Sequence, residues 1–197
     1  MVNGFKNLRI TTHLVPTKSP SLEEYQDMYA LAVVDPAMAS LILSRVSAIL
    51  KNKYLYRIVE SQTNVPWDVI SCLHSLETDL SLDKHLHNGD PLTARTINVP
   101  KGRPKSSKPP FAWVESACDA VGIYPNIPNW DIPSKLYFLE AYNGLGYRKM
   151  KVNSPYLWSM TSLYKKGKYT QDGKFSGSAV SKQIGAVALL KGLTKAI

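Results

Sequence analysis

The segment at residues 66–94, PWDVISCLHSLETDLSLDKHLHNGDPLTA, constrains the fold most, because an amphipathic pattern runs directly into a polar turn region. Pro66 suits the first turn of a helix, where its missing N–H would have no intrahelical partner. Ile70, Leu73 and Glu77 follow at spacings i, i+3 and i+7 with apolar neighbours. This is the period of a helix that buries one face. The pattern predicts a helix with Glu77 on its apolar side, near the C-terminal end.

This position determines the expected chemistry of Glu77. Burial disfavours a charged carboxylate, and so does the negative end of a helix dipole, so both effects raise the pKa of Glu77. A carboxylic acid that keeps its proton near neutral pH is what a general acid for glycosidic cleavage needs. The same spacing also fits a Glu77 that turns out to solvent at a frayed helix end.

A turn region and a short strand are predicted to follow. The dipeptides at 88–89 (Asn-Gly) and 90–91 (Asp-Pro) favour turns, and β-branched residues alternate over 93–99. A hairpin there would fold Asp90 back across a cleft from Glu77 and supply the pair of carboxyl groups that glycosidases use. Two further carboxylates compete for this role, Asp79 and Asp83. A second hairpin turn is expected at the Asp-Gly dipeptide at 172–173.

Two motifs together resemble the lysozyme superfamily. They are HSLET at 74–78 and Ala-Tyr-Asn-Gly at 141–144, which ends a later predicted helix. The resemblance covers about residues 60–190 and is to goose-type lysozymes, soluble lytic transglycosylases and phage endolysins. It implies a mainly α, α+β lysozyme-like fold with a small β-hairpin region beside the catalytic helix. It also implies that Glu77 is the acid, with Tyr142 and Asn143 supporting it.

The resemblance further implies a peptidoglycan hydrolase, a muramidase of the endolysin type that cleaves the MurNAc–GlcNAc bond. Glu77 would protonate the leaving oxygen, Asp90 would orient water or stabilise the oxocarbenium-like charge, and Thr93 would help to place the water. We also expect the Tyr142 hydroxyl to bond Glu77. Aromatic rings and polar side chains would hold the sugars. The predicted substrate-binding residues are His87, Tyr142, Asn143, Tyr156 and Trp158. No cofactor and no metal are implied.

Three other functions stay open. A lytic transglycosylase would use Glu77 alone, although the Gly-Leu-Met-Gln stretch usual in that group is replaced here by His-Asn-Gly-Asp. A zinc-dependent cell-wall peptidase would use His85 and His87 with Asp83 or Asp90, but the chain has no His-Glu-x-x-His motif. A non-catalytic wall-binding protein would keep the aromatic residues and tolerate the loss of Glu77.

The length and the charge of the chain limit the kinds of partner that it is expected to bind. The 197 residues suit a single domain over 1–197, with 1–20 as an extended lead-in. The net charge of +9 favours a partner with a negative surface, and bacterial peptidoglycan fits. The sequence has no nucleic-acid recognition motif and no apolar run of about 18 residues, so neither nucleic acid nor stable membrane insertion is expected.

The location and assembly follow from the same reasoning. The N-terminus lacks the apolar core of a signal peptide. We therefore expect the protein to be made in a cytoplasm without an export signal of its own. The resemblance to phage endolysins further implies a monomer that is released from a host cytoplasm to the cell wall or periplasm, or one that is carried in a virion. The basic, proline-rich stretch at 100–110 is predicted to be a surface loop, either simply solvated or in contact with wall phosphates or carboxylates.

Overall fold

The computed structural model describes residues 16–124, 126–171 and 173–196, so most of the expected lead-in lies outside the described residues. Within these ranges the fold is mainly helical with one pair of strands, which confirms the predicted mainly α, α+β class. The elements in chain order are α1 (Leu22–Leu31), the 3-10 helix η1 (Pro36–Met38), α2 (Ala39–Lys51), α3 (Lys53–Thr63), α4 (Trp67–Thr78), α5 (Trp113–Gly122), α6 (Ile132–Asn143), α7 (Gly146–Lys149), α8 (Pro155–Trp158), β1 (Lys168–Gln171), β2 (Lys174–Ser176) and α9 (Ala186–Ala196).

Helices α1 and α6 both begin at side-chain caps. Ser21 Oγ accepts the backbone N–H of Glu24 at 3.1 Å at the start of α1. Asp131 Oδ1 accepts that of Ser134 at 2.9 Å at the start of α6. Each cap satisfies one of the N–H groups that a helix leaves unpaired in its first turn.

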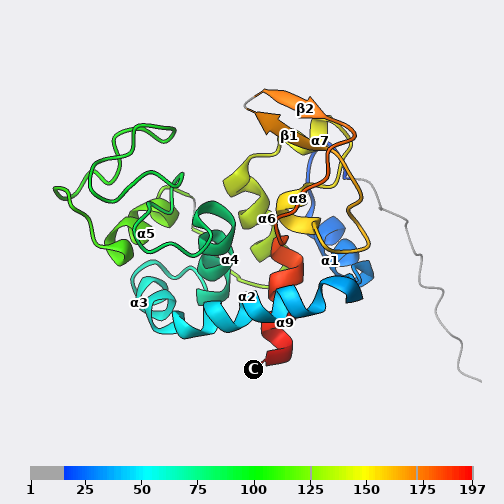
Figure 1. Ribbon diagram of the computed structural model, residues 1–197, viewed down its shortest axis with the longest axis horizontal. Coiled ribbons are helices and arrows are strands. Elements are labelled where there is room, and N and C mark those ends of the chain that lie inside the picture. Colours follow the sequence, from blue (N-terminus) through cyan, green and yellow to red (C-terminus); the bar gives the residue numbers. More distant parts are fainter. Residues whose placement is uncertain (1–15, 125, 172, 197) are drawn as a thin grey trace, which may run out of the picture.

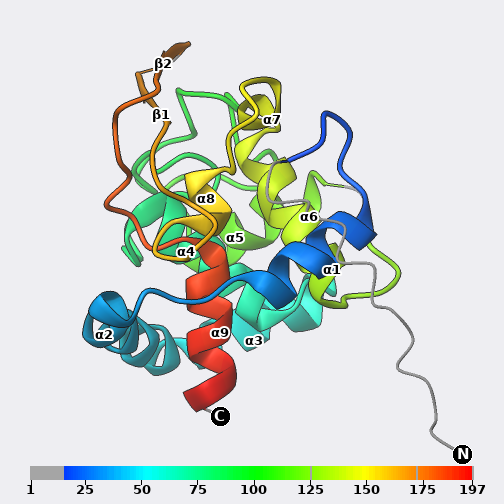
Figure 2. The same ribbon diagram turned by 90° about the vertical axis from the view of Figure 1, so that its right-hand side faces the viewer.

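Helix α4 is the interior helix of the structure. It packs against α3, α6 and α9, and Figure 1 shows it between α3 and α5 on one side and α6 and α8 on the other. Nearly all of its side chains are buried, including Ile70 and Leu73, which are fully covered. A helix that buries most of its circumference needs partners on several sides. In Figure 2 the β1–β2 hairpin lies at the opposite side of the molecule from α2.

The strand predicted at 93–99 is wrong, and so is the hairpin that it would form beside α4. Residues 80–111 run as turns and loops, with one isolated bridge between Lys84 and Pro91. The Asp90 side chain accepts the backbone N–H groups of Ile97 and Asn98, which a strand at 93–99 would pair with a neighbouring strand. Such local bonds compete with sheet formation.

The strands instead flank the second predicted hairpin turn, at 172–173, and their pairing confirms a hairpin there, although residue 172 itself lies outside the described residues. β1 pairs antiparallel with β2, with Tyr169 opposite Phe175. Gly173 has a φ of +68°, a conformation that glycine adopts without steric cost.

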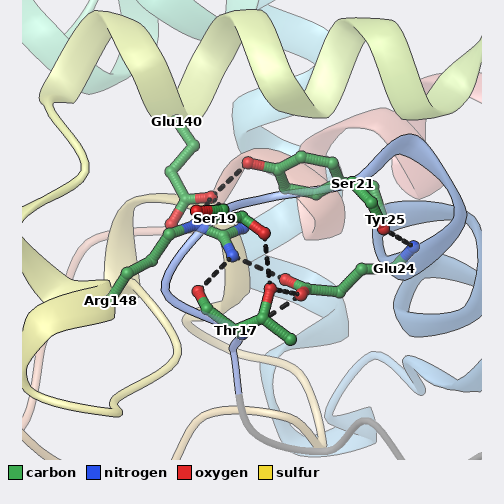
Figure 3. Close-up of polar contacts among 7 residues, drawn as sticks. All are labelled: Thr17, Ser19, Ser21, Glu24, Tyr25, Glu140 and Arg148. Carbon is green, nitrogen blue, oxygen red and sulfur yellow. Dashed lines mark hydrogen bonds and ion pairs between the residues drawn. The ribbon is translucent and has the colours of Figure 1, made fainter.

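A buried ionic cluster joins α1 to α6 and α7 (Figure 3). The Arg148 guanidinium donates to Glu140 Oε2 at 2.6 Å and to Glu24 Oε1 at 2.6 Å, and all three side chains are 2% exposed. The same guanidinium donates to the carbonyl of Thr17 at 2.9 Å, and the Tyr25 hydroxyl donates to Glu140. The cluster therefore holds one positive and two negative charges away from water.

None of the helices in the described ranges is long and apolar enough to cross a membrane.

Candidate functional site

Glu77 lies in the last turn of α4, where the chain reverses sharply. The next residues after the helix, Asp79 and Leu80, both have left-handed backbone conformations, with φ of 55° and 65°. Their N–H groups donate to the carbonyl of His74, and Gln183 Nε2 donates to that of Leu76 at 2.5 Å. Two successive non-glycine residues in this region are costly and tend to occur at functional sites.

The carboxyl group of Glu77 is mostly buried and accepts a hydrogen bond from a tyrosine. The Tyr156 hydroxyl, on α8, donates to Glu77 Oε1 at 2.6 Å. Burial raises the pKa of Glu77 to about 7, although the bond from Tyr156 lowers it in part. A substantial share of Glu77 is therefore protonated at neutral pH, as a general acid requires.

Two more tyrosines lie near Glu77. The predicted bond from Tyr142 is wrong, because the Tyr142 hydroxyl donates to the carbonyl of Leu86 at 2.9 Å. Tyr124 stacks on Tyr142 with ring centroids 4.9 Å apart. Burial raises the pKa of both phenols, and the negative charge of Glu77 raises it further. Tyr124 was not predicted, since it lies in a loop with no periodic pattern.

The turn at 88–90 does fold back onto the end of α4. A Cβ added to Gly89 would lie 3.4 Å from the carbonyl oxygen of Glu77. The Asp90 carboxylate, however, already accepts hydrogen bonds from its own loop. The backbone N–H groups of Ile97 and Asn98 donate to it at 2.8 and 3.0 Å, and Asn98 Nδ2 donates to it at 2.7 Å. Burial raises the pKa of Asp90, but these bonds outweigh it and leave the pKa below its usual value.

The remaining predicted site residues separate into buried and exposed groups. Trp158 and Tyr156 are 2% and 6% exposed, so neither ring offers a face on which a sugar can stack. This corrects the sugar contact predicted for each of them, because both side chains belong to the core. Thr93 is exposed in a turn. Asn143 is exposed at the end of α6, where it lines a surface hollow with Tyr147 and Tyr169 on the side of the β1–β2 hairpin.

The clustered histidines are held inside the structure. Both ring nitrogens of His85 are bonded, Nδ1 to Ser116 Oγ at 2.7 Å and Nε2 to the carbonyl of Ala94 at 2.8 Å. His87 Nε2 lies 2.8 Å from Asp119 Oδ2, so the substrate contact predicted for His87 is replaced by an internal one. Burial lowers the pKa of His87, which favours its neutral form.

A zinc site built on this pair therefore has no support. Across the described residues no group of three or more His, Cys, Asp or Glu side chains is arranged to hold a metal ion. His85 has no ring nitrogen left for a ligand bond.

The site thus consists of a protonatable Glu77 at a helix end, one tyrosine that bonds it and two that lie close by. Comparisons of the chain with family models, with curated proteins and with solved structures found no match.

Proposed function

We propose that the protein is a glycosidase with a lysozyme-like fold that acts, as a monomer, on the glycan strands of peptidoglycan. The observation that carries this proposal is the raised pKa of Glu77, about 7, at a strained helix end within hydrogen-bond distance of Tyr156. Glycosidic cleavage needs a carboxylic acid that is still protonated at working pH. The net charge of +9 supports attraction to a wall that carries carboxylates and phosphates.

In this mechanism Glu77 gives its proton to the glycosidic oxygen as the C1–O bond breaks, and the bonding electrons leave with that oxygen. The sugar becomes oxocarbenium-like at C1, and water then adds to C1 and returns a proton to Glu77. The Tyr156 hydroxyl donates to the carboxylate that forms, so its bond strengthens during the proton transfer.

A lytic transglycosylase is the second candidate, and the contacts of Asp90 favour it. Both oxygens of Asp90 already accept hydrogen bonds from its loop, so the described residues place no free second carboxylate beside Glu77 at this turn. A transglycosylase needs only Glu77, because the 6-hydroxyl of the same sugar attacks C1 and Glu77 takes up its proton. The product then ends in a 1,6-anhydro ring.

The test is to incubate the protein with purified peptidoglycan and to identify the new chain ends by mass, with chelator in parallel samples. Reducing ends that form equally with chelator support hydrolysis. Anhydro ends support the transglycosylase. An intact glycan overturns the glycosidase proposal, and cleaved peptide bonds would turn attention to peptidase chemistry.

The pH profile should respond to Tyr156→Phe. The rate should fall as pH rises through about 7, because Glu77 must be protonated to act as the acid. Since the Tyr156 hydroxyl stabilises the carboxylate, its removal raises the pKa of Glu77 and moves this alkaline limb to higher pH. Tyr142→Phe is the matched control, because its hydroxyl bonds Leu86. Equal alkaline limbs in wild type and Tyr156→Phe would contradict the assigned role.

A further inference from the structure

The loop between α4 and α5 exposes two aliphatic side chains. Val99 is 87% exposed and Ile97 is 72% exposed, the highest values for any large hydrophobic side chain among the described residues. Both lie in a short turn that Thr96 closes, since its N–H donates to the carbonyl of Arg103 at 2.9 Å and its carbonyl accepts the N–H of Gly102 at 2.8 Å. Figure 1 shows the loops of this region at one end of the long axis, beside α5.

This turn is held firmly although its tip is apolar. Asp90 binds the backbone of residues 97 and 98 from inside the loop. The Thr96 hydroxyl donates to the carbonyl of Pro100 and accepts the N–H of Arg103 at 2.9 Å. Asn88 Nδ2 adds a longer bond to the carbonyl of Val99, at 3.4 Å. The exposure of Ile97 and Val99 is therefore built into an ordered turn, and fixed apolar groups of this kind mark interaction sites.

The sequence on either side of the turn is rich in basic residues. Residues 84–108 contain six lysines and arginines against a single acidic residue, Asp90, whose charge is taken up inside the loop. Arg103 pairs with Asp119. Three exposed lysines lie in the turn or shortly after it: Lys101, Lys105 and Lys108. None of them forms an ion pair within the described residues.

We propose that this turn docks the protein on an anionic lipid bilayer, with Ile97 and Val99 entering the boundary between headgroups and acyl chains and the lysines meeting the headgroups. Aliphatic side chains beside lysines suit that boundary. A glycan would instead require flat aromatic rings, and residues 84–110 contain no phenylalanine, tyrosine or tryptophan. Nucleic acid would use the lysines but would leave the aliphatic groups without a partner, since base stacking requires aromatic rings.

Sedimentation with vesicles tests this surface. Wild-type protein is mixed with vesicles of phosphatidylcholine alone and with vesicles of phosphatidylcholine that contain roughly 30–40% phosphatidylglycerol, whose surface is negative. We expect binding to the anionic vesicles only, weakening as salt is raised. The double variant Ile97→Ser with Val99→Ser should bind about tenfold less or weaker still, because two aliphatic side chains no longer leave water. Lys101→Gln should bind about fivefold less.

The matched control is Leu43→Ser with Val180→Ser, two aliphatic residues that are each 57% exposed elsewhere on the surface. It should bind the anionic vesicles like wild type, and thermal unfolding of each variant shows that it is folded. No binding by wild type, or equal binding by the Ile97/Val99 variant, overturns the proposal. Another outcome also overturns the proposal: wild type does not bind vesicles but binds purified peptidoglycan or DNA, and the Ile97/Val99 variant loses that binding. The turn is then assigned to that polymer. None of these readings depends on Glu77.

Discussion

Glu77→Gln is expected to lower the rate of glycan cleavage by about 10²- to 10⁴-fold, the range that general acid catalysis contributes. The amide has nearly the same shape as the acid, and its oxygen still accepts the Tyr156 hydroxyl. It has no proton of suitable acidity to give to the leaving oxygen. The measurement is the initial rate of release of new chain ends from purified peptidoglycan at pH 6, where Glu77 is mostly protonated.

The same variant should be more stable than wild type at alkaline pH. The pKa of Glu77 is about 7 in the folded chain and near 4.5 when the chain is unfolded. Between these values the folded state binds more protons, so wild-type stability falls as pH rises through this window. The amide of the variant does not titrate. We expect thermal unfolding to show similar stabilities at pH 4, and at pH 8 an advantage for Glu77→Gln of about 1 to 3 kcal/mol.

Glu23→Gln is the control, because Glu23 is an exposed carboxylate in the first turn of α1. It should cleave at the wild-type rate and show no comparable gain in stability at pH 8. Full activity of Glu77→Gln would remove Glu77 from the mechanism. A gain in stability without loss of activity would mean that Glu77 is a buried acid with no catalytic part.

Local sequence signals predicted the helices well because each signal depends only on residues that are close together in the chain. The spacing of Ile70, Leu73 and Glu77 predicted α4, and the Ala-Tyr-Asn-Gly motif predicted the end of α6. The strand at 93–99 failed for a local reason as well. Alternating β-branched residues indicate a strand only if their backbone groups find a partner strand, and here the Asp90 side chain binds the N–H groups of Ile97 and Asn98 instead.

The site was predicted only in part because its contacts join distant segments. The position of Glu77 near a helix end and its raised pKa followed from α4 itself. The identity of its partner depended on how α6 and α8 pack, and α8 is a helix of four residues without a periodic pattern. The hydroxyl that donates to Glu77 is therefore that of Tyr156 and not, as predicted, that of Tyr142. The contacts of Asp90 were not predicted because nothing in its local sequence indicates that Asn98 and Ile97 donate to it.

Arg148→Met is expected to destabilise the fold by about 3 to 5 kcal/mol, the largest stability effect that we predict for a single substitution. Methionine fills much of the volume, but the change leaves Glu24 and Glu140 buried with no positive charge beside them (Figure 3). It also removes the donor that holds the carbonyl of Thr17. Urea unfolding at pH 7 measures the loss. Arg45→Met is the control, since its bridge to the 81% exposed Asp79 side chain should contribute about 0 to 1 kcal/mol.

Neutralising the two carboxylates should restore much of this loss. In the triple variant Arg148→Met, Glu24→Gln and Glu140→Gln, no uncompensated charge is left in the interior, so the desolvation cost of two carboxylates disappears. We expect the triple variant to regain more than half of the stability that Arg148→Met loses. If the triple variant is instead no more stable than Arg148→Met, the loss arises from the hydrogen bonds that Arg148 donates and not from charge. Because this cluster joins α1 to α6 and α7, the two outcomes distinguish charge compensation from hydrogen bonding as the interaction that fastens these helices to one another.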